Sequence, residues 1–148
     1  MKRSKKSMRT FLPDTNLFVS ALKHPEKKPY SLDLLLELIN NKDIILVGNK
    51  YLVREMEKYH EKLKSPTARE LLLGLKKKVK MVDVDRDSIL VCKTYFPKSE
   101  LSDIIHAATC IKEDSVLITN DKHFDKINNE GLIEVWSITK AIKELIPK

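Results

Sequence analysis

The chain has 148 residues, of which 42% are hydrophobic, and this suffices for one buried core but hardly for two. Its formal net charge is +7. No apolar run approaches the roughly 20 residues that span a bilayer, and no hydrophobic stretch follows the basic N-terminus, so we expect neither membrane insertion nor secretion. Cys92 and Cys110 form no C-x-x-C motif, and we expect buried packing residues in a reduced, cytoplasmic protein.

The N-terminal half begins with a basic, serine-containing arm, residues 1–9, that lacks apolar periodicity and is expected to be disordered in isolation. Its composition does not separate a phosphate-binding arm from a solvated tail. We expect a single folded domain over residues 10–148. Its first elements are predicted to be a strand over 10–14, a helix over 16–22, a loop containing Pro25 and Pro29, a helix from a Ser31 cap to about 40, and a buried strand over 43–47 ended by Gly48.

Two helices are predicted next, over about 50–64 and 66–79, and Ser65 followed by Pro66 marks the start of the second. The remaining elements are predicted to be a strand over 81–84, helices near 86–95 and 101–113, strands over 116–119 and 132–136, and a last helix from about Ser137. Strands and helices alternate, which predicts an α/β fold with parallel pairing, right-handed crossovers and helices on both faces of the sheet.

Acidic residues follow two of the predicted strands. Asp14 comes directly after the first apolar run, and Asp121 comes after the run over 116–120. In an open parallel sheet, ligands bind in the crevice beyond the carboxyl ends of the strands, so we expect these acids to meet there. Pro13 fits a central strand poorly, because its missing N–H costs a ladder bond unless the pairing ends at that point.

A third acid is selected by helical phase. At about 100° per residue, Glu55 lies about 60° from Leu52 and borders the buried stripe, whereas Glu57 and Glu61 lie on the far side. Glu55 is therefore expected to reach the crevice, and the alternative is a simple pair with a nearby lysine.

The fourth acid, Asp103, lies beside the apolar stripe of the helix over 101–113, in its early turns. The alternative role for this carboxylate is compensation of the helix dipole. His106, one turn on, is expected to be a satisfied core or rim histidine, because a lone histidine gives no zinc signature. Four carboxylates without a cysteine or histidine ligand suit Mg²⁺ or Mn²⁺.

The positive charge favours a polyanionic partner, because lysines attract phosphates while carboxylates bind the cation. A solubilising lysine-rich surface is the alternative. Lys122 and His123 are placed to meet a phosphate or a leaving group, unless His123 and Phe124 start a helix that packs a ring inward. A solvated face is expected for the basic cluster of Lys76, Lys77, Lys78, Lys80 and Arg54. A hydrophobic core is expected to contain the leucines at 34, 35, 36, 38, 71, 72, 73 and 75, some of which are expected to form a dimer seam or a partner site.

Taken together, these motifs resemble the PIN-domain ribonucleases, whose members include the VapC-type toxins. The resemblance rests on Asp14-Thr15-Asn16, Glu55, the run from Leu101 to Ala108 and the run from Leu117 to Phe124, and it extends from about Thr10 to Trp136. It implies a three-layer α/β/α sandwich with strand order 3-2-1-4-5, cleavage of RNA with Mg²⁺ or Mn²⁺, often a homodimer, and for the toxins an antitoxin partner.

The resemblance also implies roles for single residues. Catalytic and metal-binding positions fall on Asp14, Glu55, Asp103 and Asp121. Asn16 and Thr119 match polar positions that assist the carboxylates by hydrogen bonding, and Asp125 is a candidate for an extra acid near the rim.

The expected activity is that of a metal-dependent endoribonuclease. Crowded carboxylates repel, so cation binding relieves the site, and a metal-bound hydroxide held by the four acids attacks the phosphate in line to leave 5′-phosphate ends. One alternative is a PIN-like module that binds RNA or protein without cutting. A second is a Mg²⁺-dependent phosphatase, which usually carries another acid where Asn16 stands. Nucleoside-triphosphate hydrolysis is disfavoured by a total of three glycines.

Overall fold

The computed structural model describes residues 9–23, 30–96 and 101–147. The predicted arm lies outside the described residues except for Arg9, which is the first residue of a strand, and the loop with Pro25 and Pro29 also lies outside them. In the part that is described, no helix is long and apolar enough to cross a bilayer.

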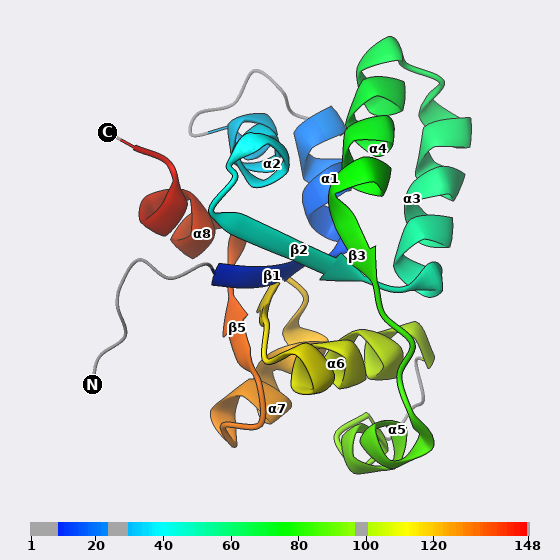
Figure 1. Ribbon diagram of the computed structural model, residues 1–148, viewed down its shortest axis with the longest axis vertical. Coiled ribbons are helices and arrows are strands. Elements are labelled where there is room, and N and C mark those ends of the chain that lie inside the picture. The colour runs from blue at the N-terminus through cyan, green and yellow to red at the C-terminus, as the bar shows by residue number, and fades with distance from the viewer. Residues whose placement is uncertain (1–8, 24–29, 97–100, 148) are drawn as a thin grey trace.

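A five-stranded parallel sheet forms the centre of the molecule, with strand order β3-β2-β1-β4-β5 (Figure 1). This confirms the predicted order. The strands are β1 Arg9–Pro13, β2 Ile44–Gly48, β3 Val79–Met81, β4 Val116–Ile118 and β5 Glu134–Trp136. Because every pair is parallel, the carboxyl ends of β1, β2 and β4 meet at one edge of the sheet.

Helices cover both faces of the sheet, so the fold is the predicted three-layer sandwich (Figure 1). One layer contains α1, α2, α3, α4 and α8, and the other contains α5, α6 and α7. The helices are α1 Thr15–Lys23, α2 Ser31–Asn40, α3 Lys50–Leu63, α4 Pro66–Lys78, α5 Arg86–Lys93, α6 Leu101–Glu113, the short 3₁₀ helix η1 Lys122–Phe124, α7 Asp125–Asn129 and α8 Ile138–Leu145.

Pro13 ends the central strand β1 without breaking its ladder. On the β4 side the backbone N–H of Asp14 donates to the carbonyl of Ile118 at 3.0 Å. Since successive residues of a strand alternate in direction, the nitrogen of Pro13 faces β2, where the register with β1 runs only to Phe11 and Leu46. The missing N–H therefore costs no ladder bond, and Asp14 leaves the sheet at its predicted position.

Two local predictions are wrong, and one short helix has no predicted counterpart. Ser31 does not cap α2 but is its first residue, behind Tyr30, and its hydroxyl instead meets that of Ser20 at 2.7 Å. The third strand covers Val79–Met81 rather than 81–84, because it is an edge strand whose exposed residues give no alternating pattern. The short helix α7 was not predicted at all, since Ile127 is the one buried residue among its five.

The core absorbs most of the leucine clusters and both cysteines. Leu34, Leu35, Leu38, Leu71, Leu72 and Leu75 are buried, whereas Leu36 and Leu73 are exposed. Both cysteines are buried free thiols, and burial raises the pKa of Cys92 to about 11 and that of Cys110 to about 12. Their predicted role as packing residues is confirmed.

Candidate active site

The four predicted acids line one pocket of about 330 Å³ at the carboxyl edge of the sheet. Asp14 follows β1, Glu55 projects from α3, Asp103 lies in the first turn of α6, and Asp121 follows β4. Thr15, Asn16, Val19, Tyr59, Ser102 and His123 complete the lining. Segments separated by more than 100 residues in the sequence thus contribute acids to one concave site.

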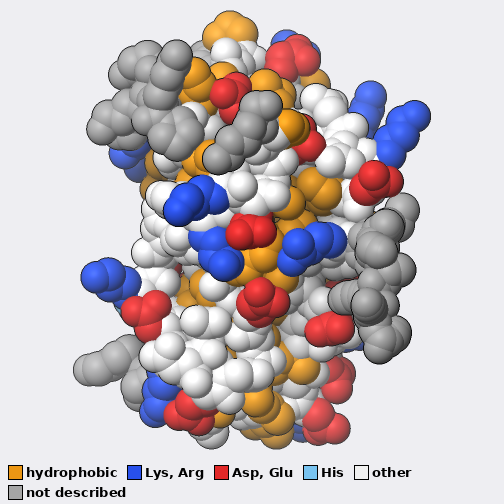
Figure 2. Space-filling view, turned by 90° about the vertical axis from the view of Figure 1, so that its left-hand side faces the viewer, with side chains coloured by type: hydrophobic (Ala, Val, Ile, Leu, Met, Phe, Trp, Pro, Cys, Tyr) orange, Lys and Arg blue, Asp and Glu red, His pale blue; other side chains and the backbone are white. Residues whose placement is uncertain are grey.

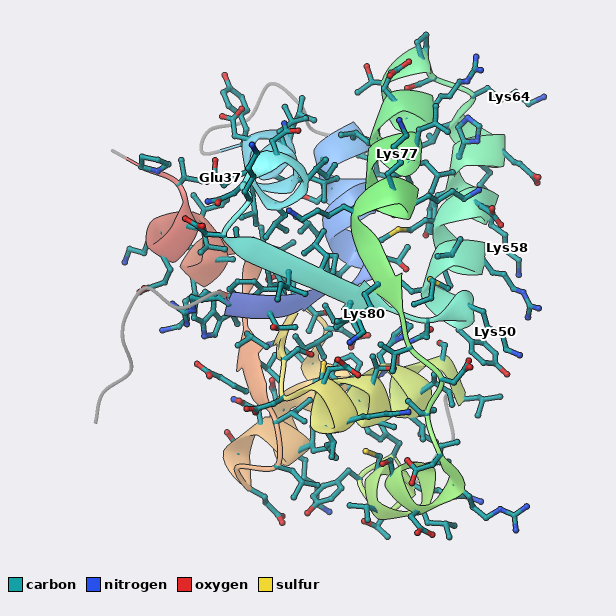
Figure 3. All side chains as sticks on the ribbon, in the orientation of Figure 1. Glu37, Lys50, Lys58, Lys64, Lys77 and Lys80 are labelled. Atoms are coloured by element: carbon teal, nitrogen blue, oxygen red, sulfur yellow. The ribbon has the colours of Figure 1, made fainter. Side chains whose placement is uncertain are left out.

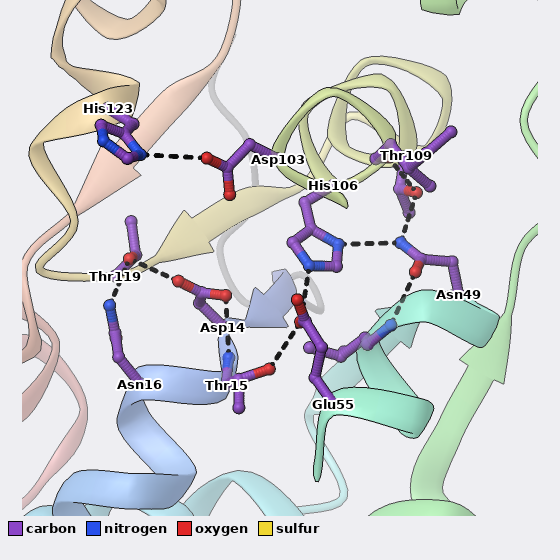
Figure 4. Close-up of polar contacts among 12 residues, drawn as sticks. Asp14, Thr15, Asn16, Asn49, Glu55, Asp103, His106, Thr109, Thr119 and His123 are labelled. Atoms are coloured by element: carbon purple, nitrogen blue, oxygen red, sulfur yellow. Dashed lines mark hydrogen bonds and ion pairs between the residues drawn. The ribbon is translucent and has the colours of Figure 1, made fainter. Parts of the chain in front are cut away.

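Thr119 organises the strand-end half of the pocket (Figure 4). Its hydroxyl donates to Asp14 Oδ2 at 2.7 Å and accepts from Asn16 Nδ2 at 2.9 Å and from the backbone N–H of Asp121 at 3.0 Å. The other oxygen of Asp14 accepts from the backbone N–H of Thr15 at 2.8 Å. One buried hydroxyl therefore connects β1, α1 and the turn after β4, and it fixes Asp14 in orientation.

Glu55 is held by donors on both sides of the pocket (Figure 4). Its Oε1 accepts from the hydroxyl of Thr15 at 2.8 Å and lies 3.2 Å from Nε2 of His106. His106 is almost fully buried, at 1% exposure, and its Nδ1 lies 3.1 Å from Nδ2 of Asn49. The expectation of a satisfied core histidine is confirmed.

The hydrogen bonds of Asn49 define the tautomer of His106. Asn49 caps α3, and its Oδ1 accepts from the backbone N–H of Leu52 at 2.9 Å. Its Nδ2 consequently donates both to Thr109 Oγ1 at 3.0 Å and to His106 Nδ1. Since Nδ1 accepts, the proton of the neutral ring is on Nε2, where it points at Glu55.

The Nε2–H tautomer argues against His106 as a metal ligand. This matters because one ligand atom from each of Asp14, Glu55 and His106 lies within 4.8 Å of the others. If Nε2 bound a metal, the proton would move to Nδ1 and face the amide donor of Asn49. Relief would require that amide to turn, which would remove the cap from α3. His106 therefore positions Glu55 rather than joining the ligand set.

On the opposite rim, His123 bridges the other two acids. Its Nδ1 lies 3.1 Å from Asp103 Oδ2 and 3.3 Å from Asp121 Oδ1, and its backbone N–H donates to Asp121 Oδ1 at 2.9 Å. The ring is 61% exposed. The alternative for this segment also holds in part, because η1 does start here and Phe124 is fully buried.

Burial and mutual repulsion perturb the acids. Burial raises the pKa of Asp103 to about 6, and the charges of Asp121 and Asp14 add to this effect, against a hydrogen bond from His123. Burial likewise raises the pKa of Asp14, despite hydrogen bonds from Thr119 and Thr15. Burial also acts to raise the pKa of Glu55, but the bonds from His106 and Thr15 outweigh it, so this pKa is lowered. The site thus favours protons or another cation beside Asp103 and Asp14.

Three predicted residues lie outside the lining of this pocket, and Thr119 is buried behind it. Lys122 is exposed on η1, and Asp125 is exposed at the start of α7. Conversely, the sequence analysis assigns no role to Thr15, Asn49 or Ser102, although Thr15 and Ser102 lie within the motifs of the resemblance. For Asn49 a signal existed, since it directly follows β2 just as Asp14 follows β1.

Comparison with known families agrees with this geometry. The family model of the PIN domain matches residues 11–130. The chain belongs to the PIN domain family. No curated protein matches it.

Three solved structures show the same fold as this PIN domain. VapBC2 from Rickettsia felis, bound to a DNA fragment from its promoter, has 16% identity and a TM-score of 0.59, over 86% of this chain and 98% of that chain. VapBC-1 from nontypeable Haemophilus influenzae has 16% identity and a TM-score of 0.60, over 88% and 99%. PAE2754 from Pyrobaculum aerophilum has 13% identity and a TM-score of 0.55, over 94% and 97%. At such low identity the likeness shows the fold alone.

The PIN domain implies a divalent metal ion, and the donor set of the pocket fits one. Carboxylates dominate the lining, and oxygen ligands of this kind suit Mg²⁺ or Mn²⁺. Asn16 Oδ1 is a further oxygen, because it is buried and has no hydrogen-bond partner among the described residues. The raised pKa of Asp103 indicates that a cation in this pocket would relieve the repulsion between Asp103 and the charges of Asp121 and Asp14.

The raised pKa of Asp103 predicts that Mn²⁺ affinity depends on pH. A proton and a metal ion compete for this carboxylate, whose pKa is about 6, so affinity should fall about tenfold from pH 7 to pH 5. A carboxylate with its ordinary pKa would stay ionised over this range and give almost no change. Isothermal titration with MnCl₂ at pH 5, 6 and 7 measures the effect, and equal affinities at all three would contradict the assignment.

Proposed function

We propose that this PIN domain is a metal-dependent endoribonuclease. The observation that carries the proposal is the convergence of Asp14, Glu55, Asp103 and Asp121 on one pocket, with a pKa pattern that favours an added cation. The net charge of +7 of the whole chain supports a polyanionic substrate.

In this proposal Asp14, Asp103 and Asp121 would hold the ion, directly or through water, and Glu55 would anchor a second ion or orient the nucleophile. The ion, when bound, lowers the pKa of water and neutralises phosphate charge. Thr119 keeps Asp14 aimed at the pocket, and His106 and Thr15 do the same for Glu55. His123 lies at the mouth, where it can meet a phosphate oxygen or the leaving 3′ oxygen, and Lys122 adds positive charge nearby.

The deciding experiment is cleavage of a defined RNA pool by the full chain with MnCl₂, with MgCl₂ and with chelator, followed by end mapping. We expect cleavage that requires the metal and leaves 5′-phosphate and 3′-hydroxyl ends. Products with cyclic phosphate ends would contradict it, because they arise from attack by the RNA's own 2′-hydroxyl.

Two alternatives have their own readouts in the same preparation. Hydrolysis of small phosphate esters without RNA cleavage would favour a phosphatase. Tight RNA or protein binding without any cleavage would favour a binding module. The four intact acids argue against the second, because a module that only binds has no need for a carboxylate whose pKa is raised to about 6.

The proposal extends to partners. The neighbours solved as VapBC complexes support a VapC-type toxin with an antitoxin partner. A homodimer is supported by exposed apolar residues on two adjacent helices, namely Leu90 and Val91 of α5 and Leu101 of α6. A cytoplasmic location is supported by the two free thiols.

A further inference from the structure

A second pocket lies beside the acidic one on α3. It has a volume of about 510 Å³ and is lined by Glu55, Lys58, Tyr59, Glu61 and Lys62. Glu55 and Tyr59 line the acidic pocket as well. The two hollows therefore share a wall, and a chain of nucleotides that leaves the acidic pocket over Tyr59 enters the second one.

The exposed side of α3 carries cations at a spacing of four residues. Lys50, Arg54, Lys58 and Lys62 are all exposed, and this spacing places them along one slowly turning stripe of the helix. Figure 3 shows Lys50 and Lys58 projecting outward from α3, away from the sheet. The lining of the second pocket also holds two acids, Glu55, which it shares with the acidic site, and Glu61.

Tyrosines interleave with these cations. Nζ of Lys62 lies 5.8 Å from the ring centroid of Tyr59, and the guanidinium of Arg54 lies 5.9 Å from that of Tyr51. Both rings are half-buried. An aromatic ring beside a cation is the combination that binds single-stranded nucleic acid, because the ring stacks on a base while the cation meets the adjoining phosphate.

Two lysines of the run over 76–80 are paired with acids. Lys76 pairs with Glu57 at 2.6 Å, and Lys80 pairs with Glu113 at 3.2 Å. Figure 2 views the molecule from the left-hand side of Figure 1, and on this face Lys and Arg side chains are interspersed with Asp and Glu. These pairs agree with the expected solvated face at Lys76 and Lys80. Arg54, which was expected to belong to that face, is instead part of the α3 stripe beside the acidic pocket.

We propose that the second pocket is the subsite for an unpaired nucleotide next to the cleaved phosphate, with Tyr59 stacking on its base and Lys58 and Lys62 binding the flanking phosphates. This assignment rests on the proposed ribonuclease function, and it makes the substrate single-stranded at this position. A base in a duplex is already stacked and cannot reach Tyr59. The lining itself balances two lysines against Glu55 and Glu61. RNA is selected as the occupant by the four exposed cations of the α3 stripe, which attract phosphates, together with a ring that can stack on a base.

The test is binding of a fluorescein-labelled single-stranded RNA dodecamer to the full chain in chelator, followed by anisotropy at several salt concentrations. Cleavage does not occur under these conditions, so the result does not depend on the ribonuclease function. The variant is K58Q/K62Q, and the control is K42Q/K77Q, which changes the net charge equally at exposed lysines outside the pocket. The slope of log Kd against log salt should fall by about 1.4 in the variant, at about 0.7 per phosphate, and hardly at all in the control.

Tyr59 is tested by Y59L, with Y59F as the matched control that keeps the ring. Loss of stacking should weaken dodecamer binding about 5- to 150-fold in Y59L, whereas Y59F should stay close to wild type. Thermal unfolding checks that both variants are folded. A double-stranded RNA of the same sequence should bind Y59L and wild type alike.

Two outcomes would overturn the subsite. If K58Q/K62Q and Y59L bind the dodecamer like their controls, α3 does not hold RNA, whatever the cleavage assay shows. If they bind RNA normally but lose a co-purified protein partner, the surface belongs to that protein. Conversely, weakened binding in a chain that never cleaves with Mn²⁺ would retain the subsite and reject the hydrolase.

Discussion

The D103N variant is expected to be more stable than wild type without metal and to be nearly inactive with it. The pKa of Asp103 is about 6 in the folded chain, against an ordinary value of 3.8. Between these values the folded state binds more protons than the unfolded state, so the free energy of unfolding falls as the pH rises through this window. Above pH 6 the penalty is complete, and at pH 7.5 it amounts to about 1–3 kcal/mol after allowance for partial solvent access.

Asparagine removes that penalty because it carries no charge. In chelator at pH 7.5, we expect the melting temperature of D103N to exceed that of wild type by about 3–10 °C. The difference should vanish near pH 4, where wild-type Asp103 is itself largely protonated. Asp43 is an exposed acid in a turn far from the pocket, with its backbone N–H bonded to Asn41, and D43N supplies a matched control that should show neither effect.

Manganese should reverse the order of stability. Wild type gains free energy of unfolding when it binds the ion, about 2.7 kcal/mol at a hundred times the Kd, whereas D103N lacks a ligand and should gain little. RNA cleavage should fall at least about 100-fold, because loss of even an outer partner of a metal site costs 10- to 100-fold. Scanning calorimetry with and without MnCl₂ measures the reversal. Equal stabilisation of both proteins by Mn²⁺ would remove Asp103 from the ligand set.

The topology of this chain follows from its pattern of apolar runs. β2 and β4 are continuous apolar segments in the centre of the sheet, and β1 is apolar and buried from Phe11 on, so their burial patterns match the sequence signal. At the edge of the sheet the apolar pattern does not identify the strand. β3 is an edge strand with a half-buried valine followed by two exposed residues, so the preceding lysines of α4 and the following Val82 compete for the boundary.

The positions of the acids can be predicted from the sequence for the same reason. Asp14 and Asp121 follow central strands, so the parallel topology alone brings them to one edge, and Glu55 follows from helical phase on α3. The hydrogen bonds of these acids and of their neighbours cannot be predicted from the sequence. The contact of Asn49 with His106 joins residues 57 positions apart, and that of Thr119 with Asp14 joins residues 105 apart. Such contacts depend on rotamers that only the packed core determines.

The same limit explains the failed cap. Serine at position 31 has the local preference for a helix N-cap, but α1 packs against α2 and offers the hydroxyl of Ser20 as a partner at 2.7 Å. The tertiary contact overrides the local preference, and the helix begins one residue earlier than the cap would allow.

The second large effect is expected at His106, where each of two substitutions keeps the hydrogen bond of one ring nitrogen and loses that of the other. H106Q places an amide nitrogen near the position of Nε2, so it keeps the donor to Glu55 and loses the acceptor for Asn49. H106N places an amide oxygen near the position of Nδ1, so it keeps the acceptor for Asn49 and loses the donor to Glu55. We expect H106N to lower Mn²⁺ affinity about 10- to 100-fold, and H106Q to stay within about threefold of wild type.

Stability should follow the opposite order. Asn49 is buried, at 2% exposure, so H106Q leaves an amide proton without its acceptor at a cost of about 1–3 kcal/mol. Glu55 is 35% exposed, and in H106N water can replace part of the lost bond. H106Q should therefore be the less stable variant and yet the better metal binder, as measured by denaturant unfolding and by titration calorimetry with MnCl₂.

This crossed order separates positioning from packing. If His106 served only to fill the core, metal affinity would decline with stability, and H106Q would be the poorer binder. If His106 were a ligand through Nε2, both amides would lose most of the affinity, because neither replaces an imidazole nitrogen on the ion. Only a ring that donates its single proton to Glu55, with that proton fixed by the cap residue of α3, gives a weak fold with strong metal binding in one variant and the reverse in the other.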